Sequence, residues 1–102
     1  MRVRWSAKAI TELESTLDFW SQKNKSDAYS EKIAIEAENV QRELEEDPYF
    51  LARYIEEEDI YQRVFFKGKF VLYYQIKEEI VMILRFRSTK QEPLYNKTLY
   101  RP

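Results

Sequence analysis

The residues best suited to chemistry in this chain are arginines, lysines and tyrosines gathered in its C-terminal part. Arginine donates to phosphate through a fixed fork of N–H groups, and aromatic rings stack on nucleic acid bases. Such a pattern is typical of a surface that receives an anionic partner. The candidate residues are Arg63, Lys67, Lys69, Arg85, Arg87, Lys90, Tyr95, Lys97, Tyr100 and Arg101.

The last predicted strand carries two arginines in close succession. Successive side chains of a strand point to opposite faces, so Arg85 and Arg87 should share the open face of a sheet. Leu84 and Phe86 should then both enter the core. An alternative stays open, in which the two arginines pair with the acidic segment 56–59 and only balance its charge.

The composition removes several familiar kinds of catalytic and metal site. The chain has no His and no Cys, so it lacks the usual neutral base, the Ser-His and Cys-His pairs and thiolate metal ligands. Its carboxylates fall in no recognisable acid–base motif, and there is no phosphate-binding glycine loop. We therefore expect no metal and no cofactor.

The net charge of −1 conceals a strong segregation of charge along the chain. Residues 26–59 carry 12 acidic and 3 basic side chains, whereas residues 60–102 carry 9 basic and 3 acidic ones. A folded chain with this pattern can present a locally positive face although it is acidic overall. The acidic runs themselves, 43–47 and 56–59, are expected to be solvated.

The length of 102 residues predicts one domain, 1–102. No apolar run approaches the roughly 20 residues that span a membrane. The first residues have the pattern of a strand and do not resemble a signal peptide. We therefore expect a cytoplasmic protein without a membrane association.

The N-terminal half predicts a strand followed by a helical hairpin. Residues 2–5 alternate polar and apolar, and Ser6 is placed to cap the next helix. A first helix is predicted over 7–22, and a second helix is predicted to end at residue 46. Pro48 disfavours helical angles in the residue before it, so the second helix should not continue further. The apolar stripes are Ile10, Leu13, Leu17 and Trp20 in the first helix and Tyr29, Ile33, Ala37, Val40 and Leu44 in the second.

The segment after Pro48 predicts a loop and three short strands. Residues 49–51 should tuck a loop into the core, and residues 53–56 should form a short edge strand. Residues 61–66 and 69–76 predict a hairpin around Gly68.

The final predicted strand, 80–86, is almost continuously apolar at its start and should be central in the sheet. In the strand before it, Tyr73 and Tyr74 should point to opposite faces, with one reaching the open side. The predicted fold class is α+β: an N-terminal strand, an α-helical hairpin, then a curled antiparallel β-sheet meander. The order is β-α-α-β-β-β-β, with the helices on one face of the sheet.

Several short motifs follow one another in this order along nearly the whole chain. Trp5-Ser6-Ala7 opens the first helix, and the helical hairpin leads to Pro48. Later motifs are Tyr61-Gln62-Arg63, Phe-Val-Leu-Tyr-Tyr at 70–74, Ile-Leu-Arg-Phe-Arg at 83–87 and Thr-Lys-Gln-Glu-Pro at 89–93. The chain thereby resembles the RelE/ParE superfamily of toxins from type II toxin–antitoxin modules.

The resemblance implies a plasmid-stabilisation type of toxin that inhibits growth until a cognate antitoxin neutralises it. The ParE branch inhibits DNA gyrase, and the RelE branch cleaves mRNA on the ribosome. The antitoxin would lie across the sheet and helices as an amphipathic helix or an extended strand. A homodimer is a further state that the sequence leaves open.

The resemblance also implies roles for the basic residues. In a ribonuclease, Arg63, Arg85 and Arg87 would hold the scissile phosphate, and Lys90 or Tyr95 would assist proton transfer. In a toxin that acts by binding, the same region would form the surface for the target or the antitoxin. That surface would comprise Arg63, Lys67, Lys69, Arg85, Arg87 and Lys90.

The leading hypothesis is binding in the ParE manner, with gyrase as the target. The chain lacks His, and it is mildly acidic where ribosome-directed members are strongly basic and gain affinity from cation–phosphate contacts. Two alternatives remain open. One is a ribosome-dependent mRNA endonuclease, and the other is an inactive toxin homologue that binds only its antitoxin.

Overall fold

The computed structural model describes residues 1–91 and Leu94, and within them the elements follow the predicted order. This confirms the predicted α+β class with a strand, a helical hairpin and a meander. The elements are β1 (Arg2–Trp5), α1 (Ala7–Asn24), α2 (Ala28–Glu46), β2 (Arg53–Ile55), β3 (Ile60–Phe65), β4 (Phe70–Lys77) and β5 (Ile80–Ser88).

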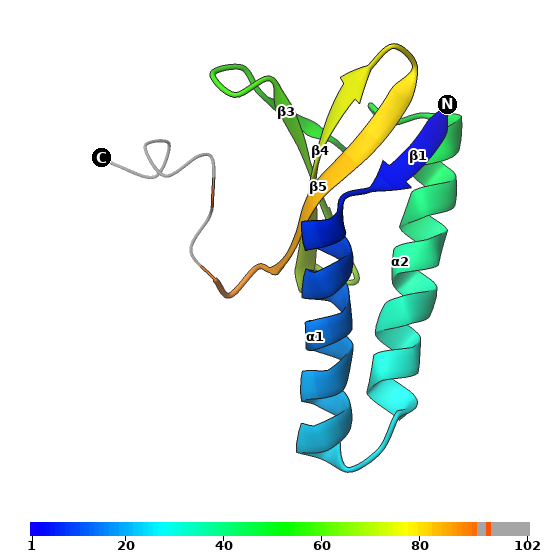
Figure 1. Cartoon of the computed structure of the whole chain (residues 1–102), viewed down its shortest axis with the longest axis vertical. Coiled ribbons are helices and arrows are strands. Elements are labelled where there is room, and N and C mark those ends of the chain that lie inside the picture. The colour runs from blue at the N-terminus through cyan, green and yellow to red at the C-terminus, as the bar shows by residue number, and fades with distance from the viewer. Residues whose placement is uncertain (92–93, 95–102) are drawn as a thin grey trace.

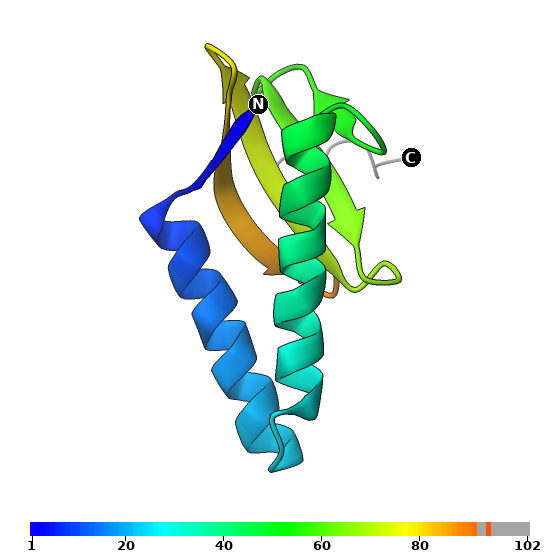
Figure 2. The same cartoon turned by 90° about the vertical axis from the view of Figure 1, so that its right-hand side faces the viewer.

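The helices and the sheet form two layers. Figure 2 shows both helices on one side of a curled sheet, close together at their connecting loop and diverging toward β1. The strand order is β1-β5-β4-β3-β2, so β5 lies between two neighbours as predicted (Figure 1). Strands β2 to β5 are antiparallel, whereas β1 pairs with β5 in parallel. The sheet is therefore mixed. The first strand after the helices, β2, runs opposite to β1, and three further reversals of the chain bring β5 parallel to β1.

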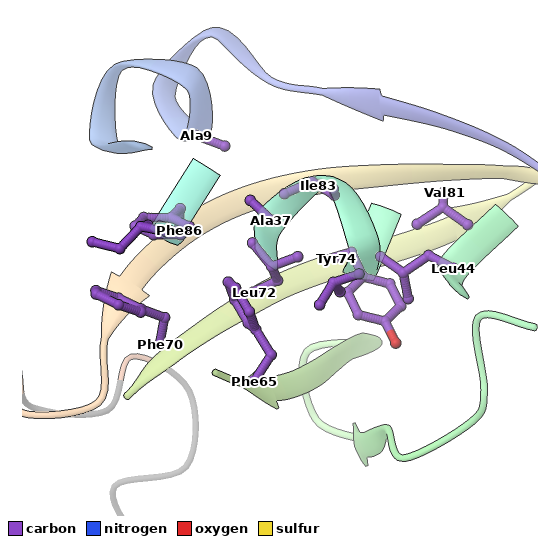
Figure 3. Packing of buried hydrophobic residues seen from close by; sticks show 12 residues of the cluster. Ala9, Ala37, Leu44, Phe65, Phe70, Leu72, Tyr74, Val81, Ile83 and Phe86 are labelled. Carbon is purple, nitrogen blue, oxygen red and sulfur yellow. The ribbon is translucent and has the colours of Figure 1, made fainter. Parts of the chain in front are cut away.

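The core lies between the helices and the inner face of the sheet (Figure 3). The α2 stripe is confirmed, since Ile33, Ala37, Val40 and Leu44 are buried there with Tyr29 packed beside them. In α1 the prediction for Ile10 is wrong, because Ala9 takes the buried position and Ile10 is 43% exposed. Sheet residues of the core include Phe65, Phe70, Leu72, Tyr74, Val81, Ile83 and Phe86.

The outer face of the sheet carries a second, smaller apolar cluster. Tyr73 lies in it, with Ile55, Ile60 and Val71, while Tyr74 lies in the main core. The two tyrosines therefore point to opposite faces as predicted. Tyr73 is nevertheless buried at 2% exposure, so it offers no open aromatic surface.

An irregularity in β5 changes the face of one predicted core residue. Tyr73 is opposite Arg85 and Tyr74 is opposite Ile83, so Leu84 is an extra residue in β5. A bulge of this kind interrupts the alternation of side chains. The prediction that Leu84 shares the core face with Phe86 is therefore wrong, since Leu84 packs against the outer cluster.

The loop after α2 also differs from its prediction. Tyr49, Phe50 and Leu51 are exposed and do not enter the core. The space beneath the loop holds Tyr74 and Arg63, which donate hydrogen bonds to Pro48 O (2.6 Å) and Phe50 O (3.4 Å). Because the loop backbone faces inward to accept these bonds, its side chains face outward.

Within residues 1–91 and 94, neither helix combines the length and the apolar character required to cross a membrane.

The burial pattern of α2 leads to a stability prediction. Ile33→Ala should lower the free energy of unfolding by about 2–5 kcal/mol, because it opens a cavity in the core. Ile35→Ala on the same helix is the matched control, since Ile35 is 54% exposed whereas Ile33 is 0% exposed. The control should change stability by no more than about 0.5 kcal/mol. Urea denaturation followed by tryptophan fluorescence measures both, and equal losses would contradict this account of the core.

Candidate functional site

Arg63, a predicted phosphate ligand, is buried beneath the loop that follows α2. It is 4% exposed, forms an ion pair with Glu43 of α2 and donates to Phe50 O. Its Nε has no hydrogen-bond partner. An anion could reach this guanidinium only by displacing Glu43 and the loop. The structure therefore places Arg63 as a residue that positions the loop.

Arg85 reaches round the edge of β5 to the first turns of α1. Its Nε lies 3.0 and 2.9 Å from the two carboxylate oxygens of Glu12, and one terminal nitrogen lies 2.6 Å from Oε2. Glu12 Oε1 also accepts the backbone N–H of Phe86 at 3.0 Å. This bidentate pair is of the strong, charge-assisted kind. The alternative that Arg85 balances the acidic segment 56–59 is wrong, because its partner is Glu12.

The ionisation of Glu12 follows from this geometry. Burial by itself raises the pKa of the carboxyl, but the hydrogen bonds from Arg85 and from the Phe86 N–H outweigh burial. The pKa of Glu12 is consequently held below its usual value of 4.5. The carboxylate is thus ionised at neutral pH and remains bound to Arg85.

Arg87 lies one step further along β5, opposite Val71 of β4. Arg85 is opposite Tyr73, so both arginines belong to the outer face of the sheet by register, as predicted. Arg87 is partly exposed at this position. Tyr95 lies outside the described residues, as do Lys97, Tyr100 and Arg101.

Two of the predicted lysines line a groove at the far end of the sheet. Two adjoining hollows of about 490 and 290 Å³ share Trp20, Phe70, Ser88 and Lys90. Lys69 lines the smaller hollow and Lys23 lines the larger one. We call this feature the lysine groove and define it by Lys23, Lys69, Lys90, Phe19, Trp20 and Tyr29.

Local geometry explains why the lysine groove forms there. The turn from β3 to β4 is closed by a hydrogen bond from Lys69 N to Phe66 O at 3.1 Å, and Gly68 adopts the positive φ of 79° that this tight turn requires. The turn brings Lys69 Nζ to 5.8 Å from the ring centroid of Tyr29 on α2. Lys67 lies exposed in the same turn, outside the lining of the groove.

Lys23 belongs to the groove although it is not among the residues predicted from the sequence. Its Nζ lies 5.4 Å from the ring centroid of Trp20 and 5.7 Å from that of Phe19. The spacing of three residues between Trp20 and Lys23 puts both on one helix face. This spacing is the feature of the sequence that could have predicted their contact. A cation over the face of an aromatic ring is attracted by the quadrupole of the ring.

The chemistry of the groove is that of anion binding. In the described part of the chain, Lys23, Lys69 and Lys90 form no ion pair, so their charges are not neutralised by a carboxylate. Hydroxyl groups of Ser15, Thr16 and Ser88 line the larger hollow beside them.

Residues 1–91 and 94 contain no cluster of carboxylates able to hold a metal ion.

The helical hairpin on one face of the sheet, with β1 paired in parallel to β5, defines an α+β domain of the RelE/ParE class. The family model described as the ParE toxin of the type II toxin-antitoxin system, parDE, matches residues 3–93, and the chain belongs to this family. It is thus a toxin of a type II toxin–antitoxin system. A comparison with curated proteins finds no match.

The ion pair between Glu12 and Arg85 predicts a pH-dependent loss of stability. Glu12→Gln should lower the free energy of unfolding by about 2 kcal/mol at pH 7, because hydrogen bonds to a charged group are lost. A carboxyl whose pKa is lowered by folding stabilises the fold above its unfolded pKa and loses that effect as pH falls through its folded pKa. The difference between the wild type and Glu12→Gln should therefore shrink as the pH falls below 4.5.

Urea denaturation between pH 7 and pH 3 measures this difference. Glu14→Gln is the matched control, since Glu14 is exposed on the same helix, and its effect should be small at every pH. A loss in Glu12→Gln that stays constant down to pH 3 would show that the charge of Glu12 is not what stabilises the fold.

Proposed function

We propose that this toxin inhibits growth by binding its target in the ParE manner, with DNA gyrase as that target. The single observation that carries the proposal is the match of the ParE toxin family to residues 3–93. A cytoplasmic location, where gyrase acts, belongs to the same proposal.

The placement of two arginines supports binding over RNA cleavage. A ribonuclease of the RelE type would use Arg63, Arg85 and Arg87 to hold the scissile phosphate. In this fold Arg63 is committed to Glu43 and Phe50 O, and Arg85 is committed to Glu12. A phosphate would have to displace a carboxylate from a guanidinium at both places, which removes most of the gain from binding it.

The lysine groove is the surface that we assign to the target. Its ammonium groups are exposed or sit on aromatic rings, and none forms an ion pair in the described part of the chain. Uncompensated charges of one sign steer an oppositely charged partner and speed association. An anionic region of gyrase, or of the DNA that gyrase holds, fits this surface.

Neutralisation by a cognate antitoxin would use another part of the molecule. The diverging helices leave an apolar groove of about 570 Å³, lined by side chains that include Trp5, Ile10, Leu13 and Ala37. An amphipathic helix can bury its apolar face in a groove of this kind. We assign this groove to the antitoxin, so the antitoxin and the target would contact different faces.

The proposal predicts that the purified toxin inhibits supercoiling by gyrase. The double variant Lys69→Glu, Lys90→Glu should require a protein concentration about tenfold higher or more for half-inhibition, because it reverses the charge of the groove. Lys8→Glu, Lys32→Glu is the matched control. It makes the same change in net charge at exposed helix positions outside the groove.

Three results would count against the proposal or a part of it. If the wild-type protein leaves supercoiling and DNA cleavage by gyrase unchanged, gyrase is not the target. If amino-acid incorporation stops within minutes of expression in bacteria while the DNA stays intact, the target is the ribosome and the RelE-type endonuclease gains support. Equal inhibition by both double variants and the wild type would show that the lysine groove does not bind the target.

A further inference from the structure

An exposed apolar surface lies at the end of the molecule opposite the lysine groove. Tyr49, Phe50 and Leu51, in the loop after α2, are 53%, 55% and 68% exposed, and Tyr54 of β2 is 48% exposed. Tyr61 connects them, since its ring centroid lies 5.6 Å from that of Tyr49 and 4.8 Å from that of Tyr54. We call these five residues the tyrosine surface.

The tyrosine surface and the lysine groove are separated by the length of α2. Tyr29 is at the start of this helix and the loop follows its end, and a helix of 19 residues is roughly 28 Å long. Figure 1 shows the two ends of α2 at opposite ends of the molecule. The surface is therefore an independent site, and it does not depend on the gyrase proposal.

The fold holds this surface in place. The buried Tyr74 hydroxyl donates to Pro48 O at 2.6 Å, the Asp47 carboxylate accepts the Tyr49 N–H at 3.0 Å, and Arg63 donates to Phe50 O. Burial raises the pKa of Tyr74 far above its ordinary value, so the donor keeps its proton. A side chain that is already positioned loses less entropy when a partner binds it.

The composition of the surface is that of a protein-binding site. Soluble proteins rarely leave contiguous large apolar side chains exposed, and Tyr is enriched among the residues that dominate binding energy at interfaces. Leu51 is the most exposed large apolar residue of the described chain and adopts a positive φ of 56°. That backbone conformation is costly for a residue with a side chain. The fold thus presents apolar groups outward at a cost.

The charge around the surface selects the partner. Residues 43–59 contain eight carboxylates and one basic side chain, Arg53. Glu43 pairs with Arg63, and Asp59 pairs with Lys77 at 2.6 Å. The remaining six are exposed and form no ion pair within the described residues: Glu45, Glu46, Asp47, Glu56, Glu57 and Glu58. The rim of the surface is consequently strongly negative.

A negative rim excludes several occupants by repulsion. A second copy of this chain would bring the same carboxylates against its own, and nucleic acid would bring phosphates. A cationic protein segment meets attraction instead. Its arginine or lysine groups can pair with the free carboxylates and lie over the tyrosine rings, while its apolar groups cover Phe50 and Leu51.

We propose that the tyrosine surface binds a segment of another protein that places arginine or lysine beside apolar side chains. The test uses two helical peptides with the same leucine face, one with arginine and the other with glutamate on the polar face. Amide shifts of the ¹⁵N-labelled toxin are followed by NMR. The arginine peptide should shift Tyr49, Phe50, Leu51 and Tyr54, and its affinity should fall as salt is added. The glutamate peptide should not bind.

Two variants test whether the peptide binds specifically to the tyrosine surface or adsorbs non-specifically to the protein. Phe50→Ser, Leu51→Ser should weaken the arginine peptide about tenfold or more, as expected when central apolar contacts are removed. Ile35→Ser is the matched control, since Ile35 is similarly exposed on α2 at 54%, and it should bind like the wild type. No shifts with the arginine peptide, or shifts that both peptides share, would overturn the proposal. So would a dimer in light scattering that the double variant abolishes.

Discussion

The part of the β5 edge that β1 leaves uncovered dictates how α1 packs against the sheet. β1 covers that edge only as far as Ile83, and the unpaired backbone groups beyond it must find other partners. The start of α1 supplies them. Ser6 donates to Ile83 O and Leu84 O, and Glu12 accepts from Phe86 N while it holds Arg85. The same Ser6 hydroxyl caps the helix through Ala9 N. The strand edge and the helix start are thus one unit.

A second device links the core to the surface at the other end of the sheet. Tyr74 and Arg63 belong to the inner face, yet their polar ends satisfy the carbonyls of the loop after α2. A buried charge requires a partner, and Glu43 provides it. The consequence is a loop with a fixed backbone and outward side chains. Apolar residues are exposed there because polar groups from the core hold the backbone inward.

The segregation of charge along the chain gives the folded molecule one positively charged end and one negatively charged end. Lys23, Lys69 and Lys90 gather at the turn between β3 and β4, while the acidic residues of 43–59 surround the far end of α2. The lysine groove proposed for the target and the apolar groove proposed for the antitoxin are both distinct from this acidic end. Ends of opposite charge favour partners of different chemistry.

Periodicity, capping and turn residues act over a few neighbours, so the order of the elements, the α2 stripe and the hairpin at Gly68 could be predicted from the sequence alone. Lys69 and Lys90 are among the candidate residues predicted from it. Other features depend on how distant elements pack: Arg63 is buried, Arg85 binds Glu12 across 73 positions, Leu84 changes face and residues 49–51 point outward. Alternation cannot anticipate a bulge. Nor can composition show which cations meet a carboxylate, because such pairs depend on elements that are distant in the chain.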